Sequence, residues 1–399
     1  MTTQPLTSRN TTTKLKAGIV GLGLLGNQYL SLFEKRSDIE VVGVCDVRRD
    51  VAESTAAQYH TAAYLDTADL LKAQHPDLVV VATPDHLHFA PTVAAIDAGT
   101  PIIIQEKPLA TSPEEAAVIY DKVEQRGVKF FINYANRAMP YDLATYYVLQ
   151  KQIIGMPVYA ESRLDDNISV PMSLWGARSR EFAAGSSPAH FLLSHVVDLM
   201  HWYFSPSRVI EVYAISQERV LQFTPDLFDA YLIFDNGLKA RVKAEWIKHM
   251  DQIVEYYTSI TGEQGSIIYN KRPGFGVQES WRANMSAPPA DDVLLEYHQQ
   301  LGQQGVETRL AYHFRPTAAP YDVSTVRASF EHTGSDQADG MMLVGPMLDA
   351  VAEGTLAPSS WHDRGPLPTH RDGLRQVQVV QAILDSARSG QPVTVGHSL

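Results

Sequence analysis

The stretch Gly21-Leu22-Gly23-Leu24-Leu25-Gly26, which continues the apolar run Ala17–Leu22, decides the fold. In this G-x-G-x-x-G pattern the first glycine permits a tight turn, the second a close approach to a pyrophosphate, and the third close packing of a helix on a strand. The N-terminus of a helix beginning near Leu24 would point its amides at the phosphates. Asp46 follows Gly26 by 20 residues, the spacing expected of a carboxylate that binds the adenosine ribose. The sequence therefore predicts a dinucleotide-binding unit.

The acidic residue at the end of the second apolar run bears on the choice of dinucleotide. A carboxylate at Asp46 would repel the 2′-phosphate of NADP, which favours NAD. Arg48 and Arg49 follow closely, and their positive charges leave NADP as an alternative. A glycine turn beside a surface aspartate is the plainer interpretation of the motif. The position of the glycines between a predicted strand and a predicted helix argues against it.

Residues 16 to 134 alternate between strand and helix patterns. Short apolar runs predict the strands Ala17–Leu22, Ile39–Asp46, Leu78–Thr83, Pro101–Glu106 and Lys129–Tyr134. Amphipathic stretches separate these runs, which predicts a doubly wound parallel sheet with helices on both faces. Ser112-Pro113-Glu114-Glu115 has the pattern of a helix start, with an N-cap serine and a proline in the first helical position, and Gly127 is suited to end that helix.

After Arg137 the pattern changes to alternating apolar and polar residues. This alternation predicts a largely antiparallel, open sheet with the strands Val158–Arg163, Val209–Ile215, Ala230–Phe234, Leu238–Ala244, Tyr256–Thr261 and Ser266–Tyr269. Asn236-Gly237 predicts a hairpin turn. An apolar stripe from Leu374 to Ala387, followed by Gly390, predicts a last helix. Residues 271 to 340 give no clean pattern.

Length and composition set the domain organisation and exclude several classes of protein. The 399 residues carry 33 Lys and Arg against 45 Asp and Glu, a net charge of −12. We divide them into a disordered tail (1–13), a dinucleotide-binding domain (14–135) and an α/β domain for substrate binding and oligomerisation (136–399). The single cysteine, Cys45, excludes an internal disulfide, and no apolar run reaches the roughly 18 residues of a membrane span. Without a basic run for nucleic-acid phosphates, we expect a cytoplasmic protein that acts on a small molecule.

Six short motifs occur in a fixed order along the chain. They are GLGLLG at 21–26, TPDHLH at 83–88, EKP at 106–108, Arg137, GMP at 155–157 and HVVDLMHW at 195–202. Together they resemble the glucose–fructose oxidoreductase, inositol dehydrogenase and MocA (Gfo/Idh/MocA) family over the whole chain except residues 271–340. The resemblance implies a Rossmann domain joined to an α/β domain whose open sheet walls the substrate pocket. It also implies NAD(P)-dependent oxidation of a sugar or polyol, or reduction of the corresponding ketone, by a homo-oligomer, either a dimer or a tetramer.

The resemblance implies a chemical role for two side chains. Lys107, held near the nicotinamide by Pro108, would stabilise the alkoxide that develops as hydride leaves, and His195 would exchange the hydroxyl proton. An imidazole pKa of about 6.5 suits that exchange. The alternatives are a solvated surface lysine and a structural histidine, because His195, Asp198 and His201 share one helix face.

The resemblance also places further side chains around the cofactor and the substrate. The predicted cofactor residues are Gly21, Gly23, Leu24, Leu25, Gly26, Asp46, Arg48, Thr83, Pro84, His88, Glu106, Lys107 and Arg137. The candidate substrate residues are Lys107, Arg137, Arg163, Asp165, Trp175, His190 and His195. For Arg163, Asp165 and Trp175 a surface or core role is equally open. We predict no metal site, because the spacing of the histidines matches no established ligand set.

One position departs from the family pattern. Dehydrogenases of the family typically carry an aspartate four residues before the histidine and a glycine two before it, where this chain has Phe191 and Leu193. Either other groups, with His190 as one candidate, rebuild the proton relay, or the substrate differs, or dehydrogenase activity is weakened. Two alternative functions follow. One is a glycosidase or epimerase-like enzyme that holds NAD tightly and oxidises its substrate transiently, and the other is a non-catalytic protein that binds the cofactor.

Overall fold

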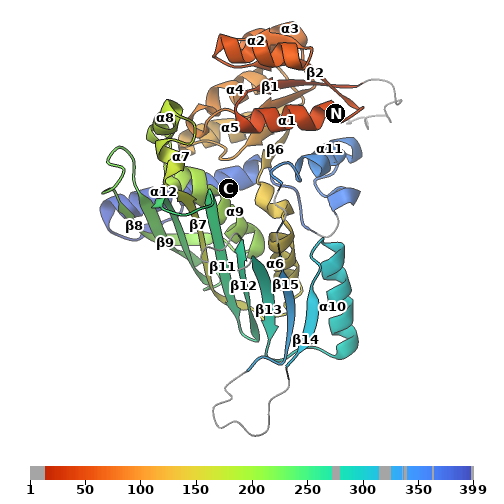
Figure 1. Ribbon diagram of the computed structural model, residues 1–399, viewed down its shortest axis with the longest axis vertical. Coiled ribbons are helices and arrows are strands. Elements are labelled where there is room, and N and C mark those ends of the chain that lie inside the picture. The colour runs from red at the N-terminus through yellow and green to blue at the C-terminus, as the bar shows by residue number, and fades with distance from the viewer. Residues whose placement is uncertain are drawn as a thin grey trace.

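The computed structural model describes residues 14–271, 279–313, 325–334, 336, 339–361 and 364–396. Two sheets organise this part of the chain, with the first above the second in Figure 1. The tail predicted at residues 1–13 lies outside the described residues. No helix within the described ranges has both the length and the apolar character needed to cross a membrane.

The first sheet is parallel and has six strands in the order β3-β2-β1-β4-β5-β6. Its strands are β1 (Leu15–Val20), β2 (Ile39–Cys45), β3 (Ala62–Tyr64), β4 (Leu78–Val81), β5 (Ile102–Glu106) and β6 (Lys129–Asn133). Its helices are α1 (Leu24–Glu34), α2 (Arg49–Gln58), α3 (Thr67–Gln74), α4 (Phe89–Asp97) and α5 (Pro113–Arg126). The five predicted strands are confirmed, and β3 was missed because three residues are too few to show a pattern.

Helices cover both faces of this sheet, as predicted. Val80 on β4 belongs to the same apolar cluster as Tyr29 on α1, whereas its neighbours Val79 and Val81 belong to a cluster with Ile96 on α4. Successive side chains of a strand point to opposite faces, so the two clusters lie on the two sides of the sheet. The fully apolar sequence of β4 follows from this double burial.

The signals for the ends of α5 are also confirmed. The hydroxyl of Ser112 accepts a hydrogen bond from the amide of Glu115 at 3.2 Å, and Pro113 occupies the first turn. Gly127 ends the helix with φ +66°, a left-handed conformation that glycine adopts without the strain of a Cβ.

The second sheet has ten strands in the order β14-β15-β13-β12-β11-β7-β10-β9-β8-β16. Its strands are β7 (Pro157–Asn167), β8 (Val209–Gln217), β9 (Leu227–Phe234), β10 (Lys239–Lys248), β11 (Val254–Gly262), β12 (Gly265–Lys271), β13 (Ser280–Met285), β14 (Arg309–Tyr312), β15 (Ala328–Thr333) and β16 (Val393–Thr394). Only β7 and β10 pair in parallel, so the predicted, largely antiparallel sheet is confirmed. β13, β14 and β15 lie in the region without a clean sequence pattern.

Helices and short helical turns connect these strands. The helices are α6 (Pro140–Gln150), α7 (Ser169–Met172), α8 (Ala177–Gly185), α9 (Ser194–Tyr203), α10 (Asp291–Gln303), α11 (Val344–Glu353) and α12 (His370–Ser389). The short turns are η1 (Asp85–Leu87), η2 (Ala135–Ala138), η3 (Ala189–Leu193) and η4 (Ser359–Trp361). The predicted turn at Asn236-Gly237 joins β9 to β10, with φ +89° at Gly237.

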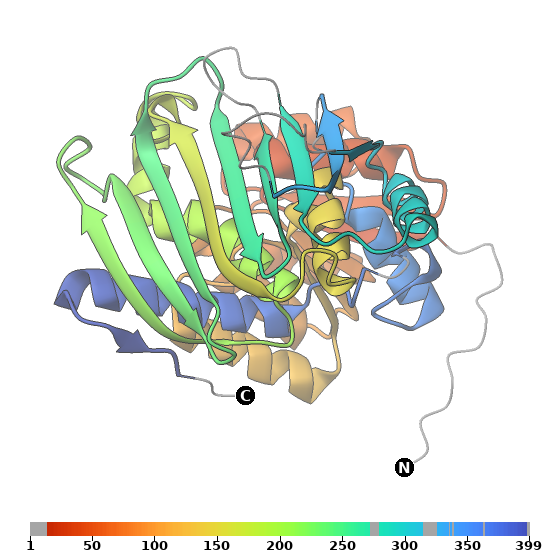
Figure 2. The same cartoon turned by 90° about the horizontal axis from the view of Figure 1, so that it is seen from below.

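The two faces of the second sheet differ. On β7 the side chains of Ala160, Ser162 and Leu164 are buried on the inner face, which packs against α9 and η3. Glu161 and Arg163 alternate with them and point to the outer face. Figure 2 shows the strands side by side in front of these helices. The alternation along β7 therefore decides which of its residues can reach a site between the two sheets.

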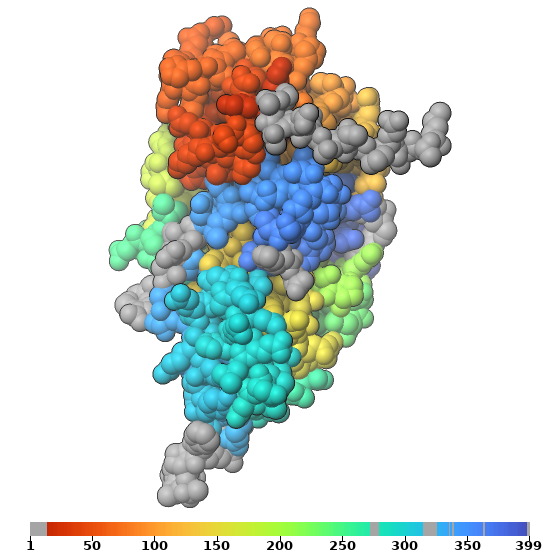
Figure 3. All heavy atoms as spheres, turned by 90° about the vertical axis from the view of Figure 1, so that its right-hand side faces the viewer, coloured from red at the N-terminus to blue at the C-terminus, as the bar shows by residue number. Residues whose placement is uncertain are grey.

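The last helix belongs to both halves of the molecule. α12 packs on α5 and β6 of the first half and on α9 and β8 of the second. Its residues Leu374 and Val377 are buried in the same apolar cluster as Val79 and Ile119 of the first half. Figure 3 shows the neighbouring blue segment, which holds α11, lying between the red first half and the cyan α10. The chain thus returns to its first sheet after completing the second.

Candidate functional site

The glycine motif forms the turn between β1 and α1. Gly21 has φ +91°, and a Cβ on Gly26 would overlap the carbonyl oxygen of Gly21. A Cβ on Gly23, by contrast, would meet no atom within 4 Å, and no side chain caps α1. Leu24 is exposed and Leu25 partly buried at the start of the helix. The amides at the start of α1 are therefore uncapped, and the space over Gly23 is open to a ligand. Both features suit a bound pyrophosphate.

Asp46 lies beside this turn, directly after β2. Its carboxylate accepts hydrogen bonds from the amide of Leu22 at 3.1 Å and from the guanidinium of Arg48 at 3.0 Å. Burial acts to raise the pKa of Asp46, but these donors outweigh it and hold the pKa below its usual range. Asp46 is therefore a charged acceptor in the position predicted for a ribose contact, and Arg48 is its partner.

The loops after β4 and β5 are fastened to each other. The ring nitrogens of the buried His88 lie 2.6 Å from the carbonyl oxygen of Pro108 and 2.8 Å from that of Thr83. The side-chain amide of Gln105 donates to the same Pro108 oxygen at 3.0 Å. His88 therefore holds the two loops together. Contact of Thr83 and Pro84 with the cofactor stays a prediction.

Glu106 and Lys107 turn to opposite sides of their loop. Glu106 accepts from the hydroxyl of Tyr29 at 2.9 Å and from the amide of Asn133 at 2.8 Å, within the first half. The ammonium of Lys107 reaches the second half, where it donates to the carbonyl oxygen of Phe191 at 2.9 Å and lies 4.1 Å from the centre of that ring. Burial lowers the pKa of Lys107, while nearby carboxylates oppose this effect. The lysine is thus an enclosed cation where the two halves meet.

His195 lies near this ammonium, one helical turn after Phe191. Its Nδ1 is enclosed and has no hydrogen-bond partner among the described residues. Its pKa lies well below the usual value because of burial, and the charges of Lys107 and Lys271 lower it further. The structure therefore brings the two predicted reaction residues together, with the imidazole in its neutral form.

Arg137 is only 2% exposed, and the Nε and Nη2 of its guanidinium are hydrogen-bonded to carboxylates. It donates to Asp198 on α9 at 2.6 and 2.9 Å and to Asp372 on α12 at 3.0 Å. Burial acts to lower the pKa of Arg137, but the two carboxylates outweigh it and raise the pKa. Asp198, which shares a helix face with His195, therefore forms part of an ion-pair cluster that joins η2, α9 and α12.

Arg163 and Asp165 lie on the outer face of the second sheet. The buried carboxylate of Asp165 binds the ammonium groups of Lys243 at 3.2 Å and Lys248 at 2.8 Å, and Arg163 binds Glu255 at 2.6 Å. The structure does not bring these two predicted substrate residues to Lys107. The reason is the alternation of β7, which turns every odd-numbered residue from 159 to 165 away from the inner face.

Two other predicted substrate residues border the site. Trp175 packs edge-to-face on Phe182, which packs in turn on Phe191 with ring centres 5.0 Å apart. The Nδ1 of His190 lies 2.9 Å from the hydroxyl of Ser187, and its Nε2 is enclosed. Both therefore belong to the wall that carries Phe191.

Sequence reasoning missed two inner-face residues of the second sheet. Asp166 on β7 is 3% exposed, and Trp246 on β10 is fully buried. The predicted strand ended at Arg163, so the alternation was not extended to Asp166. Continuing it from Ala160 would have placed a carboxylate on the buried face, a placement that usually marks function.

Enclosed polar atoms without partners gather on the segments around Lys107. Within the described residues these include Thr83 Oγ1, His86 Nδ1, Asp166 Oδ2 and His195 Nδ1. Buried polar groups are usually paired, so such a set suits a ligand rich in hydroxyl groups. No group of His, Cys, Asp and Glu side chains in the described part of the chain is arranged to hold a metal ion.

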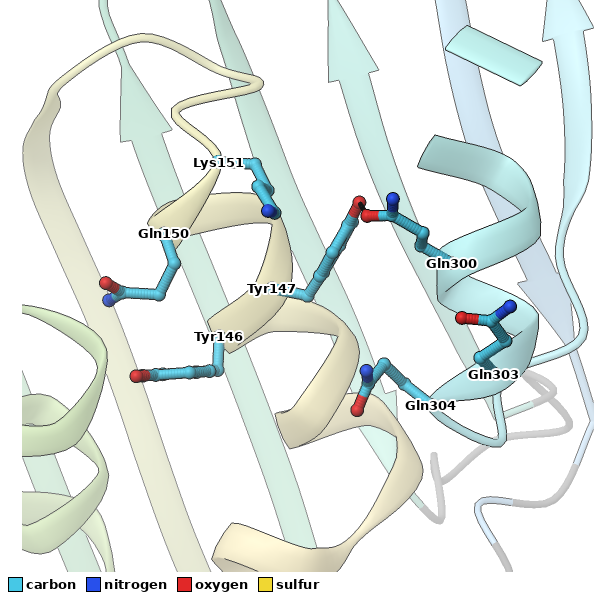
Figure 4. Close-up of a pocket in the computed structure, with 7 residues that line it drawn as sticks. All are labelled: Tyr146, Tyr147, Gln150, Lys151, Gln300, Gln303 and Gln304. Carbon is cyan, nitrogen blue, oxygen red and sulfur yellow. Dashed lines mark hydrogen bonds between the residues drawn. The ribbon is translucent and has the colours of Figure 1, made fainter. Parts of the chain in front are cut away.

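A cleft of about 310 Å³ lies elsewhere, between α6 and α10. Figure 4 shows its lining residues Tyr146, Tyr147, Gln150, Lys151, Gln300, Gln303 and Gln304. The hydroxyl of Tyr147 is hydrogen-bonded to Gln300 across it. No residue of the glycine or EKP motif lines this cleft, so it is separate from the candidate site.

A dinucleotide cradle opposite an enclosed lysine and a set of polar groups defines a nicotinamide-dependent oxidoreductase. Residues 15–134 match the model of the oxidoreductase family with an NAD-binding Rossmann fold, and residues 148–395 match that family's C-terminal α/β domain. The chain therefore belongs to the Gfo/Idh/MocA oxidoreductase family.

Curated relatives and solved structures agree with this assignment. D-glucoside 3-dehydrogenase of Escherichia coli K12 is 26% identical over 53% of this chain and 60% of that enzyme. Inositol 2-dehydrogenase of Salmonella typhimurium is 26% identical over 63% of this chain and 72% of that enzyme. The structure of a levoglucosan dehydrogenase in complex with NADH and levoglucosan has a TM-score of 0.72 and 20% identity, over 96% of this chain and 100% of that one. At 20% identity, the likeness to the levoglucosan dehydrogenase structure shows a shared fold.

Proposed function

We propose that the protein is an NAD-dependent dehydrogenase or reductase that acts on a carbinol or ketone of a sugar, polyol or related hydroxy compound. The observation that carries this proposal is the set of unpartnered polar atoms around Lys107, which a polyhydroxylated ligand would satisfy. The substrates named for the relatives, glucosides and inositols, have this chemistry.

The two halves divide the work in this proposal. Residues 14–135 hold NAD through the glycine turn, with Asp46 on the ribose, and residues 136–399 hold the substrate against Lys107. Bound NAD supplies a hydride acceptor. The ammonium of Lys107 has two protons left after its bond to Phe191, and these suit the developing alkoxide. The neutral His195 orients the hydroxyl through its free nitrogen.

A dehydrogenase screen tests this proposal. Purified protein is incubated with NAD or NADP and a panel of D-glucosides, inositols, levoglucosan, sugar acids and polyols, and NADH absorbance is followed. Accumulation of NADH with at least one panel member is the expected result. Product formation without net NADH would indicate transient oxidation on a tightly held cofactor, and binding of NAD without turnover of any member would indicate a non-catalytic protein.

Replacing Asp46 by alanine is expected to shift the cofactor preference. The Asp46→Ala variant loses the ribose acceptor and frees Arg48 for a 2′-phosphate, so NAD affinity should fall about tenfold while NADP affinity holds or rises. Calorimetric titration with both dinucleotides measures this. Asp38→Ala, which removes a surface ion pair with Arg36, is the control. Equal losses for NAD and NADP would contradict the ribose contact.

We further propose a homo-oligomer, a dimer or a tetramer, formed through the outer face of the second sheet. Tyr213, Ile215 and Tyr231 lie together on this face and are 43, 53 and 43% exposed. Covering them would remove an apolar patch from water. Ile215→Glu should reduce the mass measured by analytical ultracentrifugation to that of a monomer, and an unchanged mass would refute this interface.

We also propose a cytoplasmic location, with which the free, buried thiol of Cys45 is consistent.

A further inference from the structure

The phenyl ring at position 191 leaves the reaction centre without the usual neighbouring carboxylate. Three carboxylates act on the charge of Lys107: those of Asp85, Glu106 and Asp166. Asp85 accepts the hydroxyl of Ser186 at 2.7 Å. Glu106 accepts two hydrogen bonds within the first half. Asp166 differs, because its Oδ2 has no partner among the described residues.

The backbone of β7 aims Asp166 at the site. Asp166 lies on the same face as Leu164 and pairs with Val254, one residue beyond the outward Asp165. The indole of Trp246, on the adjacent strand, shares this inner face and lies beside the Asp166 carboxyl, whose pKa it lowers as a hydrogen-bond donor. An unpaired, enclosed carboxylate oxygen costs free energy unless a ligand completes it.

The surroundings of Asp166 suit a proton acceptor better than those of His195. Burial raises the pKa of Asp166 to about 7, whereas Lys107 and a hydrogen bond from Trp246 oppose the rise and Asp165 adds to it. An acceptor works best when its pKa lies near the working pH. His195 faces two cations, Lys107 and Lys271, and these disfavour an imidazolium.

We propose that Asp166 accepts the substrate's hydroxyl proton and so takes the place of the aspartate absent at position 191. This inference rests on the proposed function. In the oxidation direction the carbinol C–H bond breaks and its hydrogen leaves with both electrons for NAD⁺, which is reduced. The O–H bond breaks as well, its electron pair forms the carbonyl bond, and its proton binds Asp166 Oδ2. Lys107 stays protonated throughout, and His195 acts as a positioning residue.

The test compares Asp166→Asn with Glu161→Gln. Both changes turn a β7 carboxylate into its amide, but Glu161 points to the outer face. With NAD and the best panel substrate of the wild type, Asp166→Asn should lower kcat about 10²-fold or more and leave the dissociation constant of NAD unchanged. Glu161→Gln should keep wild-type kcat. A kcat for Asp166→Asn within threefold of wild type would overturn the inference.

The pH profile separates this role from a structural one. In the wild type kcat/KM should rise with pH and level off above about pH 7, as Asp166 loses its proton. The charged groups that act on Asp166 are Lys107, from the loop after β5, and Asp165, adjacent on β7. The rise should vanish in Asp166→Asn, and a profile unchanged by the substitution would assign the rise to another group.

A second variant guards against loss of structure. Asp166→Ala should be restored in part by added formate, which supplies the missing carboxylate, whereas the wild type and Glu161→Gln should not respond. Absence of rescue in a variant that unfolds like the wild type would contradict the inference. If the wild type turns over no panel member, the proposed function falls and this inference falls with it. If the wild type is active and both Asp166 variants match it, this inference alone falls.

Discussion

Replacing Lys107 by methionine is expected to abolish turnover, lowering kcat by about 10³-fold, while the affinity for NAD stays within about twofold. Methionine keeps the length and apolar stem of the side chain but removes the ammonium that donates to Phe191 and faces the reaction centre. The cradle at Gly21–Gly26 lies on a different loop and is left intact. Steady-state kinetics together with calorimetric titration of NAD would measure both quantities.

Lys129→Met is the matched control for this experiment. Lys129 lies at the start of β6 in the first sheet, and its ammonium also donates to a backbone carbonyl, that of Val351, at 3.0 Å. Unlike Lys107, it belongs to none of the sequence motifs. Its loss should leave kcat unchanged. Near-normal turnover of Lys107→Met across the panel would show that the alkoxide is stabilised by another group.

Replacing Arg137 by methionine is expected to lower the free energy of unfolding by about 3–5 kcal/mol. The guanidinium is the partner of Asp198 and Asp372, and removing it leaves the buried carboxylate of Asp198 without a cation. Chemical denaturation followed by intrinsic fluorescence would report the loss as a shift of the unfolding midpoint. A site role alone would instead raise KM and leave the midpoint in place.

Arg371→Met provides the comparison for Arg137. Arg371 is also close to the start of α12, where it binds Glu124 at 2.8 Å, but more than half of its side chain is exposed. Solvent screens this pair, so its loss should cost no more than about 1 kcal/mol. Equal effects of the two substitutions would contradict the structural importance of the buried pair.

The first half of the fold was predictable because its signals are local. β4 and β5 are short apolar runs buried on both faces, and Ser112 and Gly127 act through their own backbone neighbours. The conformation of the glycine turn depends on three glycines that lie close together in the sequence, Gly21, Gly23 and Gly26. The second half depends on pairings between distant strands, such as β13 with β15, which no local pattern reveals.

Site residues that belong to a sequence motif could be predicted, whereas residues whose side-chain face depends on the alternation along a strand could not. Lys107 and His195 lie near enough for the charge of Lys107 to lower the pKa of the imidazole, and their roles in the reaction stay predictions. Asp165 was chosen over Asp166, although one step along β7 exchanges the outer for the inner face. The ion pairs of Arg137 with Asp198 and Asp372 were not predicted, because these partners lie 61 and 235 residues away along the chain, and contact of Arg137 with a ligand stays a prediction.

The placement of α12 has a consequence for how the protein is made. Leu374 and Val377 fill the core of the first half, although the ribosome synthesises them more than 230 residues after the last strand of that half. The first domain therefore waits for the end of translation before its core is closed. A nascent chain stalled before His370 would present an apolar surface beside α5, a surface of the kind that chaperones bind.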